Sequence, residues 1–170
     1  MAATVRLHVW TGAAADTDGG SADSFSFLDT DSALNTAAVR IAYPIDIPTS
    51  GCDYSYEKWI SACVSVAPTN NIGTFEVWGS PPGEAFPTGT CWLVGTAACA
   101  AGSTPTNTSS SIATSSLADA TSDAKATWDS ASYHDAACQT VYLVMQLQAT
   151  TTATVGNWGP CSLNYSYKET

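Results

Sequence analysis

Charged residues, and cations above all, are scarce in this sequence. Only 12% of its 170 residues are charged, against roughly 25% in typical soluble domains. Lys and Arg total five, whereas Asp and Glu total fifteen, which gives a formal net charge of −10. Neutralising phosphates needs clustered Lys and Arg, and so does attraction to an anionic lipid surface. The composition therefore argues against nucleic acid and against anionic membranes as partners.

Long apolar runs are also missing. No stretch approaches the roughly 18 consecutive apolar residues that indicate a membrane-spanning helix. The segment TVRLHVW at residues 4–10 is too short and too polar for the core of a signal peptide, and it alternates like a strand. We therefore expect no membrane partner and synthesis in a cytoplasm.

Groups that could support catalysis are few. His8 and His134 are the two imidazoles of the chain, and nucleophilic catalysis needs a base beside a Ser, Cys or Thr. Ser132, His134 and Asp135 are neighbours in sequence, which does not make them converge in space. The sequence has no phosphate loop and no dinucleotide fingerprint, and its aspartates cluster in loops, where this residue usually bonds its own backbone. We expect a protein that is not an enzyme, with no catalytic, cofactor-binding or metal-binding residues.

The six cysteines allow two interpretations. They stand at positions 52, 63, 91, 99, 138 and 161, without the Cys-x-x-Cys spacing typical of zinc sites. They could form disulfides once the protein reaches an oxidising medium, or they could be small buried apolar residues. The spacing of Cys91 and Cys99 suits a hairpin, so this pair is the predicted disulfide.

The residues that are abundant favour strands. Few Leu, Glu and Lys disfavour long helices, whereas Thr, Val, Tyr and Trp favour extended structure. Short alternating segments separated by turn residues are typical of a sandwich. The sequence therefore predicts an all-β fold, a single β-sandwich or jelly-roll-like domain over residues 1–170 with long irregular loops. Strands are expected at 4–10, 24–28, 39–47, 54–66, 72–78, 90–95, 141–148 and 161–168, with one short strand near Ile112.

Two segments show weak periodicity and small side chains. Residues 1–24 and 97–137 are candidate arms or loops that reach neighbouring subunits, because long irregular excursions often have a contact role. The alternative interpretation is that both segments are surface loops with no partner.

The tryptophans also leave two interpretations open. Trp59, Trp78 and Trp92 alternate with the apolar positions of their predicted strands. They are candidate exposed or interface aromatics, which could form a platform for stacking on sugar rings. Alternatively, both faces of the sheet are covered, by a second sheet or by a neighbouring subunit, and the indoles pack there. We favour the covered arrangement.

Four stretches together resemble a known class of proteins. They are YPIDIPTSG at 43–51, YSYEKW at 54–59, NIGTFEVW at 71–78 and SLNYSYKE at 162–169. The pattern, which covers about residues 40–168, is similar to small virion structural proteins of tailed bacteriophages, including phages of cyanobacteria, and among these to capsid decoration (cement) proteins.

The resemblance implies a β-rich domain on the outer surface of the capsid in the virion. There it would bind the major capsid protein, as a homotrimer, and bridge neighbouring subunits. A tail or fibre component of the same virion is the nearest alternative. A carbohydrate-binding β-sandwich module and a surface filament subunit come next.

Overall fold

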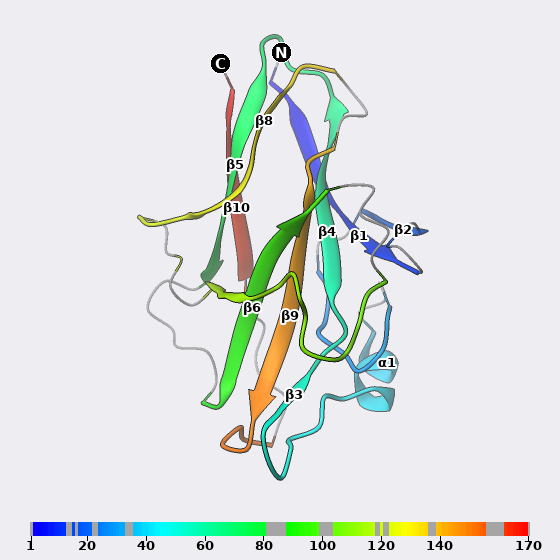
Figure 1. Ribbon diagram of the computed structural model, residues 1–170. Helices are drawn as coiled ribbons and strands as arrows, with labels where there is room; N and C mark the ends of the chain where they lie inside the picture. Colours follow the sequence, from blue (N-terminus) through cyan, green and yellow to red (C-terminus); the bar gives the residue numbers. More distant parts are fainter. Residues whose placement is uncertain are drawn as a thin grey trace.

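The computed structural model describes residues 2–12, 15, 17–21, 24–32, 36–80, 88–98, 104–117, 120, 123–135, 139–155 and 162–169. These residues form ten strands and one short helix, and the strands make two antiparallel sheets (Figure 1). The all-β fold class expected from the sequence is confirmed.

The larger sheet contains seven strands in the order β2-β1-β4-β9-β6-β7, with β3 also paired to β9. Seven of the eight described side chains from Tyr142 to Ala149 in β9 are buried. A strand buried on both faces loses the apolar–polar alternation of a half-exposed strand. The larger sheet is therefore covered on both sides around β9. Its strands are β1 (Thr4–Thr11), β2 (Thr17–Ser21), β3 (Cys52–Tyr54), β4 (Lys58–Val66), β6 (Thr90–Ala97), β7 (Ser115–Ser116) and β9 (Tyr142–Thr150).

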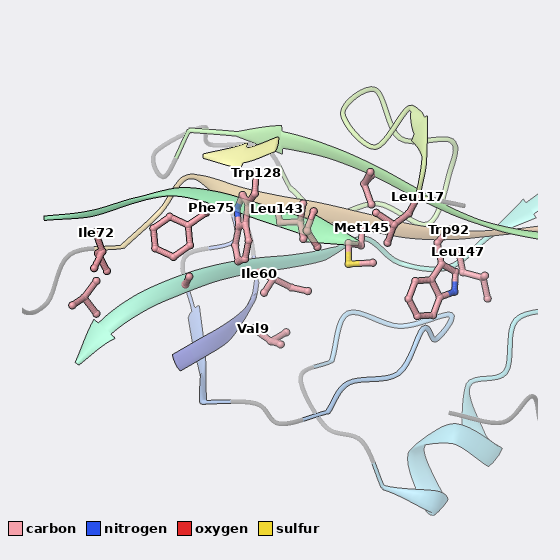
Figure 2. Packing of buried hydrophobic residues seen from close by; sticks show 14 residues of the cluster. Val9, Ile60, Ile72, Phe75, Trp92, Leu117, Trp128, Leu143, Met145 and Leu147 are labelled. Atoms are coloured by element: carbon pink, nitrogen blue, oxygen red, sulfur yellow. The ribbon is translucent and has the colours of Figure 1, made fainter. Parts of the chain in front are cut away.

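The smaller sheet has the order β10-β5-β8, with β5 (Ile72–Ser80) between β10 (Ser162–Glu169) and β8 (Ala126–Tyr133). It packs against one face of the larger sheet, and the two share one apolar core (Figure 2). Phe75 of β5 is fully buried. Its ring lies 6.1 Å from those of Trp128 and Tyr133 and 5.6 Å from that of Tyr167, centroid to centroid. One aromatic side chain thus joins all three strands of the smaller sheet.

The loop at 24–32 completes the core beyond the smaller sheet. Phe25 and Phe27 pack against the shared core, and Leu28 is buried. The Phe27 ring lies 5.4 Å from the indole of Trp92. The strand predicted at 24–28 is absent, but the apolar side chains that suggested it are core residues.

The strand predicted at 39–47 is wrong, because residues Ala37–Ala42 form the short helix α1. The Thr36 side chain accepts a hydrogen bond from the Val39 amide at 3.3 Å, the usual role of a Thr at a helix start. Alanines at the first helical positions favour the helix further. Tyr43 precedes a proline and leaves the helical region, as the ring of the next residue requires.

Parts of the two segments predicted as arms or loops, residues 1–24 and 97–137, are strands, and their contact role stays a prediction. β1 pairs with β4 from Thr4 to Trp10, which confirms the strand predicted at 4–10 and leaves no free arm there. Residues 126–133 are β8, a strand that the sequence analysis missed. The short strand expected near Ile112 is β7, three residues later.

Strand β8 has few apolar residues. The polar side chain of Asp129 holds much of this strand in place. The buried Asp129 carboxylate accepts hydrogen bonds from the Ala131 amide at 2.8 Å, the Tyr133 hydroxyl at 2.6 Å and the Val141 amide at 2.9 Å. The indole of Trp128 donates to the Val141 carbonyl at 3.0 Å. The two bonds to Val141 tie β8 in the smaller sheet to the residue that directly precedes β9 in the larger one.

We predict that Phe75→Ala lowers the free energy of unfolding by about 3–5 kcal/mol, because it opens a cavity among three aromatic neighbours. Chemical denaturation followed by far-ultraviolet circular dichroism measures the change. Val155→Ala is the matched control, since Val155 is 94% exposed, and it should stay within about 0.5 kcal/mol of the parent protein. A loss below about 1 kcal/mol for Phe75→Ala would show that the two sheets do not share this core.

Candidate interaction surface

Trp59 and Trp92 are not exposed aromatics. Trp59 has no exposed surface and Trp92 only 8%. The Trp59 indole donates to the buried Glu57 carboxylate at 2.9 Å and packs edge-on against the Tyr142 ring at 5.3 Å. Trp92 instead faces the shared core between the sheets. The covered arrangement is correct for both, and the cover is the chain itself.

The outer face of the larger sheet is covered by residues 104–113, which Gln146 of β9 holds in place. Its amide nitrogen lies at hydrogen-bonding distance from the carbonyl oxygens of Ser55 (2.9 Å), Thr106 (3.3 Å) and Thr108 (2.8 Å). Its amide oxygen accepts from the Ser110 amide at 3.0 Å. A fully buried glutamine in an apolar strand was the available sequence signal for this contact, because a buried polar side chain needs partners.

Trp78 is the only one of the three tryptophans that reaches the surface, on the outer face of the smaller sheet. It is partly exposed, and the Lys125 ammonium lies 4.9 Å from its ring centroid, within cation–π range. Lys125 also donates to the Ser166 hydroxyl at 3.0 Å and lies 3.5 Å from the Glu76 carboxylate. This face therefore combines one indole with a small polar network.

The most exposed apolar side chains of structured elements lie on what we call the α1 segment, residues 37–48. Ile41 is 81% exposed and Tyr43 is 49% exposed, and α1 has no buried residue. Helix α1 lies beside the larger sheet, away from the smaller one (Figure 1). An isolated helix of this length is not stable in water, and grouped exposed apolar side chains often mark contact sites. The sequence analysis missed this surface because it assigned these side chains to a strand.

The α1 segment is nevertheless fixed at its C-terminal side. The Asp29 amide donates to the Tyr43 carbonyl at 3.1 Å, and Ile45 packs against the shared core. The loop at 24–32 and the core thus hold the segment in a defined position while Ile41 faces solvent.

The predicted disulfide between Cys91 and Cys99 stays a prediction. Cys91 carries a free thiol, and its sulfur lies 3.2 Å from the Ser116 hydroxyl across the β6–β7 pair. Cys99 lies outside the residues that the structure describes.

Each of the two histidines lies beside an aspartate. His134 and Asp135 are exposed, with the His134 Nε2 atom 3.2 Å from the Asp135 carboxylate, and the His8 Nδ1 atom lies 3.0 Å from the Asp18 carboxylate. Across the described residues, no three or more His, Cys, Asp or Glu side chains gather as a metal site would require. The described part of the chain also holds no helix with the length and apolarity to cross a membrane.

Comparison with known proteins provides no relative. No family model matches the chain, and neither the curated proteins nor the solved structures give a match. The assignment of a function therefore depends on the surface and on the resemblance described above.

We predict that the tryptophans differ in access to solvent. Trp78→Phe should lower the fraction of fluorescence that acrylamide quenches. Trp59→Phe should raise that fraction, because it removes an indole with no exposed surface that acrylamide does not reach. Trp59→Phe should instead cost about 1–3 kcal/mol of stability, because the buried Glu57 carboxylate loses its donor. Equal quenching losses in the two variants would contradict the assigned burial.

Proposed function

We propose that this chain is a non-enzymatic structural protein of a phage virion, a capsid decoration (cement) protein that binds the major capsid protein. It would lie on the outer capsid surface as a homotrimer after synthesis in the host cytoplasm. The observation that supports a binding role most directly is the exposed α1 segment on a fixed two-sheet scaffold. The phage assignment itself depends on the sequence resemblance, and the stretch 43–51 that contributes to it overlaps the α1 segment.

Mass action explains how such a protein would stabilise a shell. A protein that bridges subunits binds the assembled capsid but not its separated parts, so each bound copy shifts the equilibrium toward the intact particle. Three linked copies add avidity, because the second and third contacts become intramolecular. Each single contact can therefore be small, such as the one that the α1 segment offers.

The size of one contact can be estimated from its side chains. Full burial of an exposed Ile contributes about 1.5–3 kcal/mol, and Ile41 is 81% exposed before binding. Tyr43 adds apolar ring area together with a hydroxyl that can bond a polar partner. A capsid surface that is apolar at its centre would fit this segment.

A carbohydrate-binding module is the second candidate, and Trp78 is the observation that favours it. Its partly exposed indole, with Glu76, Lys125 and Ser166 beside it, offers one stacking surface and several hydrogen-bonding groups. One aromatic side chain is a small platform, however, and the polar groups already bond each other. The outer face of the smaller sheet around Trp78 is therefore weaker support for carbohydrate binding than the α1 segment is for binding a protein.

We predict that replacing Ile41 and Tyr43 by Ser weakens binding to capsids stripped of this protein by about tenfold or more, because the lost burial of Ile41 alone is worth about one factor of ten or more. Co-sedimentation of purified protein with such particles measures the affinity. Val155→Ser is the matched control, since Val155 is equally apolar and 94% exposed, and it should bind like the parent.

Electron microscopy of complete particles separates the proposals. A cement protein should occupy the capsid surface, and particles without it should lose DNA at lower temperature. Density at the tail would instead identify a tail or fibre component. Binding to a glycan array that Trp78→Ala abolishes, with no binding to capsids, would identify a sugar-binding module.

A further inference from the structure

Exposed carboxylates border the apolar side chains of the α1 segment. Asp29 and Asp46 are both exposed. The backbone amide of Asp29 donates to the Tyr43 carbonyl at 3.1 Å, and Asp46 follows Tyr43 by three residues within the segment. The exposed side chains of Ile41 and Tyr43 therefore form an apolar centre with negative charge at its border.

The Asp29 carboxylate is already held in position. Its Oδ1 atom accepts a hydrogen bond from the side-chain amide of Asn107 at 2.9 Å. It thus lies where the loop at 24–32, the α1 segment and the segment 104–113 come together. An ionised carboxylate offers about four acceptor positions, and this bond uses one of them. Asp29 can therefore accept further hydrogen bonds from a partner, and a side chain that is already fixed loses less entropy on binding.

The chain itself has few cations to balance these carboxylates. Its net charge is −10, with five Lys and Arg residues in all. Of these, Lys58 is buried, and Lys125 lies beside Glu76 on the smaller sheet. Within the described part of the chain, no ion pair involves Asp29 or Asp46. A basic partner would therefore meet little competition for these two carboxylates.

The same charges indicate which partner fits this surface. A second copy of the chain would bring its own net charge of −10, and like charges across a contact are unfavourable. Nucleic acids and anionic lipids need clustered Lys and Arg, which this segment lacks. A protein surface with basic side chains gains both the burial of Ile41 and the attraction of the carboxylates. Arg40 precedes the apolar pair in α1, so the basic groups of the partner belong beside Asp29 and Asp46.

We propose that the α1 segment binds a basic protein surface. An apolar socket in this surface takes Ile41 and Tyr43, and Arg or Lys side chains at the rim of the socket pair with Asp29 and Asp46. Arginine fits a carboxylate best, because its planar group donates two parallel hydrogen bonds to it. The inference rests on the proposed function, since the capsid is the partner on which it is tested first.

The charged rim and the apolar centre should affect different rates. Charges at a rim steer the encounter, so they raise the association rate and make it sensitive to salt. Apolar burial acts once the surfaces are in contact, so its loss mainly speeds dissociation. Kinetic measurements can therefore separate the contribution of Asp29 and Asp46 from that of Ile41.

Surface plasmon resonance with the full-length chain and immobilised capsids stripped of this protein measures both rates. Association should slow as sodium chloride rises from about 25 to about 500 mM, because salt screens the rim charges. The double variant Asp29→Asn and Asp46→Asn should associate about threefold or more slowly at low salt and lose most of the salt dependence. Asparagine at position 29 can still accept from Asn107, so this loss reports the charge. Ile41→Ser should instead mainly raise the dissociation rate.

The matched control removes the same amount of charge elsewhere. Asp135→Asn together with Glu169→Gln also deletes two exposed carboxylates. They lie at the end of the smaller sheet where Tyr133 and Glu169 flank Ile72, away from α1 (Figure 1). This variant should keep the association rate and the salt dependence of the parent. Capsid binding whose association rate ignores salt, or falls equally in both double variants, would overturn the inference and leave the proposed function standing.

A second measurement does not depend on the capsid. Nuclear magnetic resonance of the isotope-labelled chain, titrated with a peptide of alternating arginine and leucine, should show amide shifts concentrated at Asp29, Ile41, Tyr43 and Asp46. A peptide with glutamine in place of arginine should not produce them. Such shifts in a chain that binds no capsid would support the inference and refute the proposed function. Shifts spread over all surface carboxylates, or no shifts, would overturn the inference.

Discussion

The burial of β9 on both faces is the constraint on which the rest of the structure depends. A central strand with apolar side chains on each side needs a cover on both faces of its sheet. The smaller sheet covers one face together with the loop at 24–32. The segment 104–113 covers the other face, and Gln146 anchors it to the strand that it covers. The long connections that look irregular in sequence are therefore structural layers of the domain.

Strands that follow a simple apolar pattern could be predicted from the sequence, because alternation directly reports which side chains face a core. This holds for β1, β5 and β10. Strands β4, β6 and β9 were instead recognisable as longer runs of mostly apolar residues, which are typical of strands covered on both faces. The prediction of strands failed where hydrogen bonds or helix capping, rather than apolar alternation, decide the local structure. β8 depends on the Asp129 hydrogen bonds and one tryptophan rather than on a run of apolar residues. In α1, alternating Val39, Ile41 and Tyr43 suggested a strand, but the Thr36 cap and the alanines decide the local conformation.

The candidate surface was harder to predict than the fold, because exposure is a property of the tertiary structure. Periodicity placed Trp59, Trp78 and Trp92 in strands, but it could not show what lies above each face. The segment over the larger sheet buries Trp59, the inner core buries Trp92, and only Trp78 remains accessible. The exposure of Ile41 was hidden for the same reason, since a helix with no buried residue has no apolar stripe for a sequence pattern to reveal.

The loop at 24–32 connects the interior of the domain to its candidate surface. Its phenylalanines enter the core, its Asp29 amide donates to the Tyr43 carbonyl, and its Ser32 carbonyl accepts a hydrogen bond from the buried amine of Lys58. The core contacts of Phe25 and Phe27 limit how far the loop can move. Helix α1 has no buried residue, so it does not limit the movement of the loop further. A binding segment loses less entropy on contact when it is already fixed. The way this loop is anchored therefore determines how well the α1 segment is organised for a partner, and its anchors are the core contacts of Phe25 and Phe27 and the hydrogen bond from the Lys58 amine to the Ser32 carbonyl.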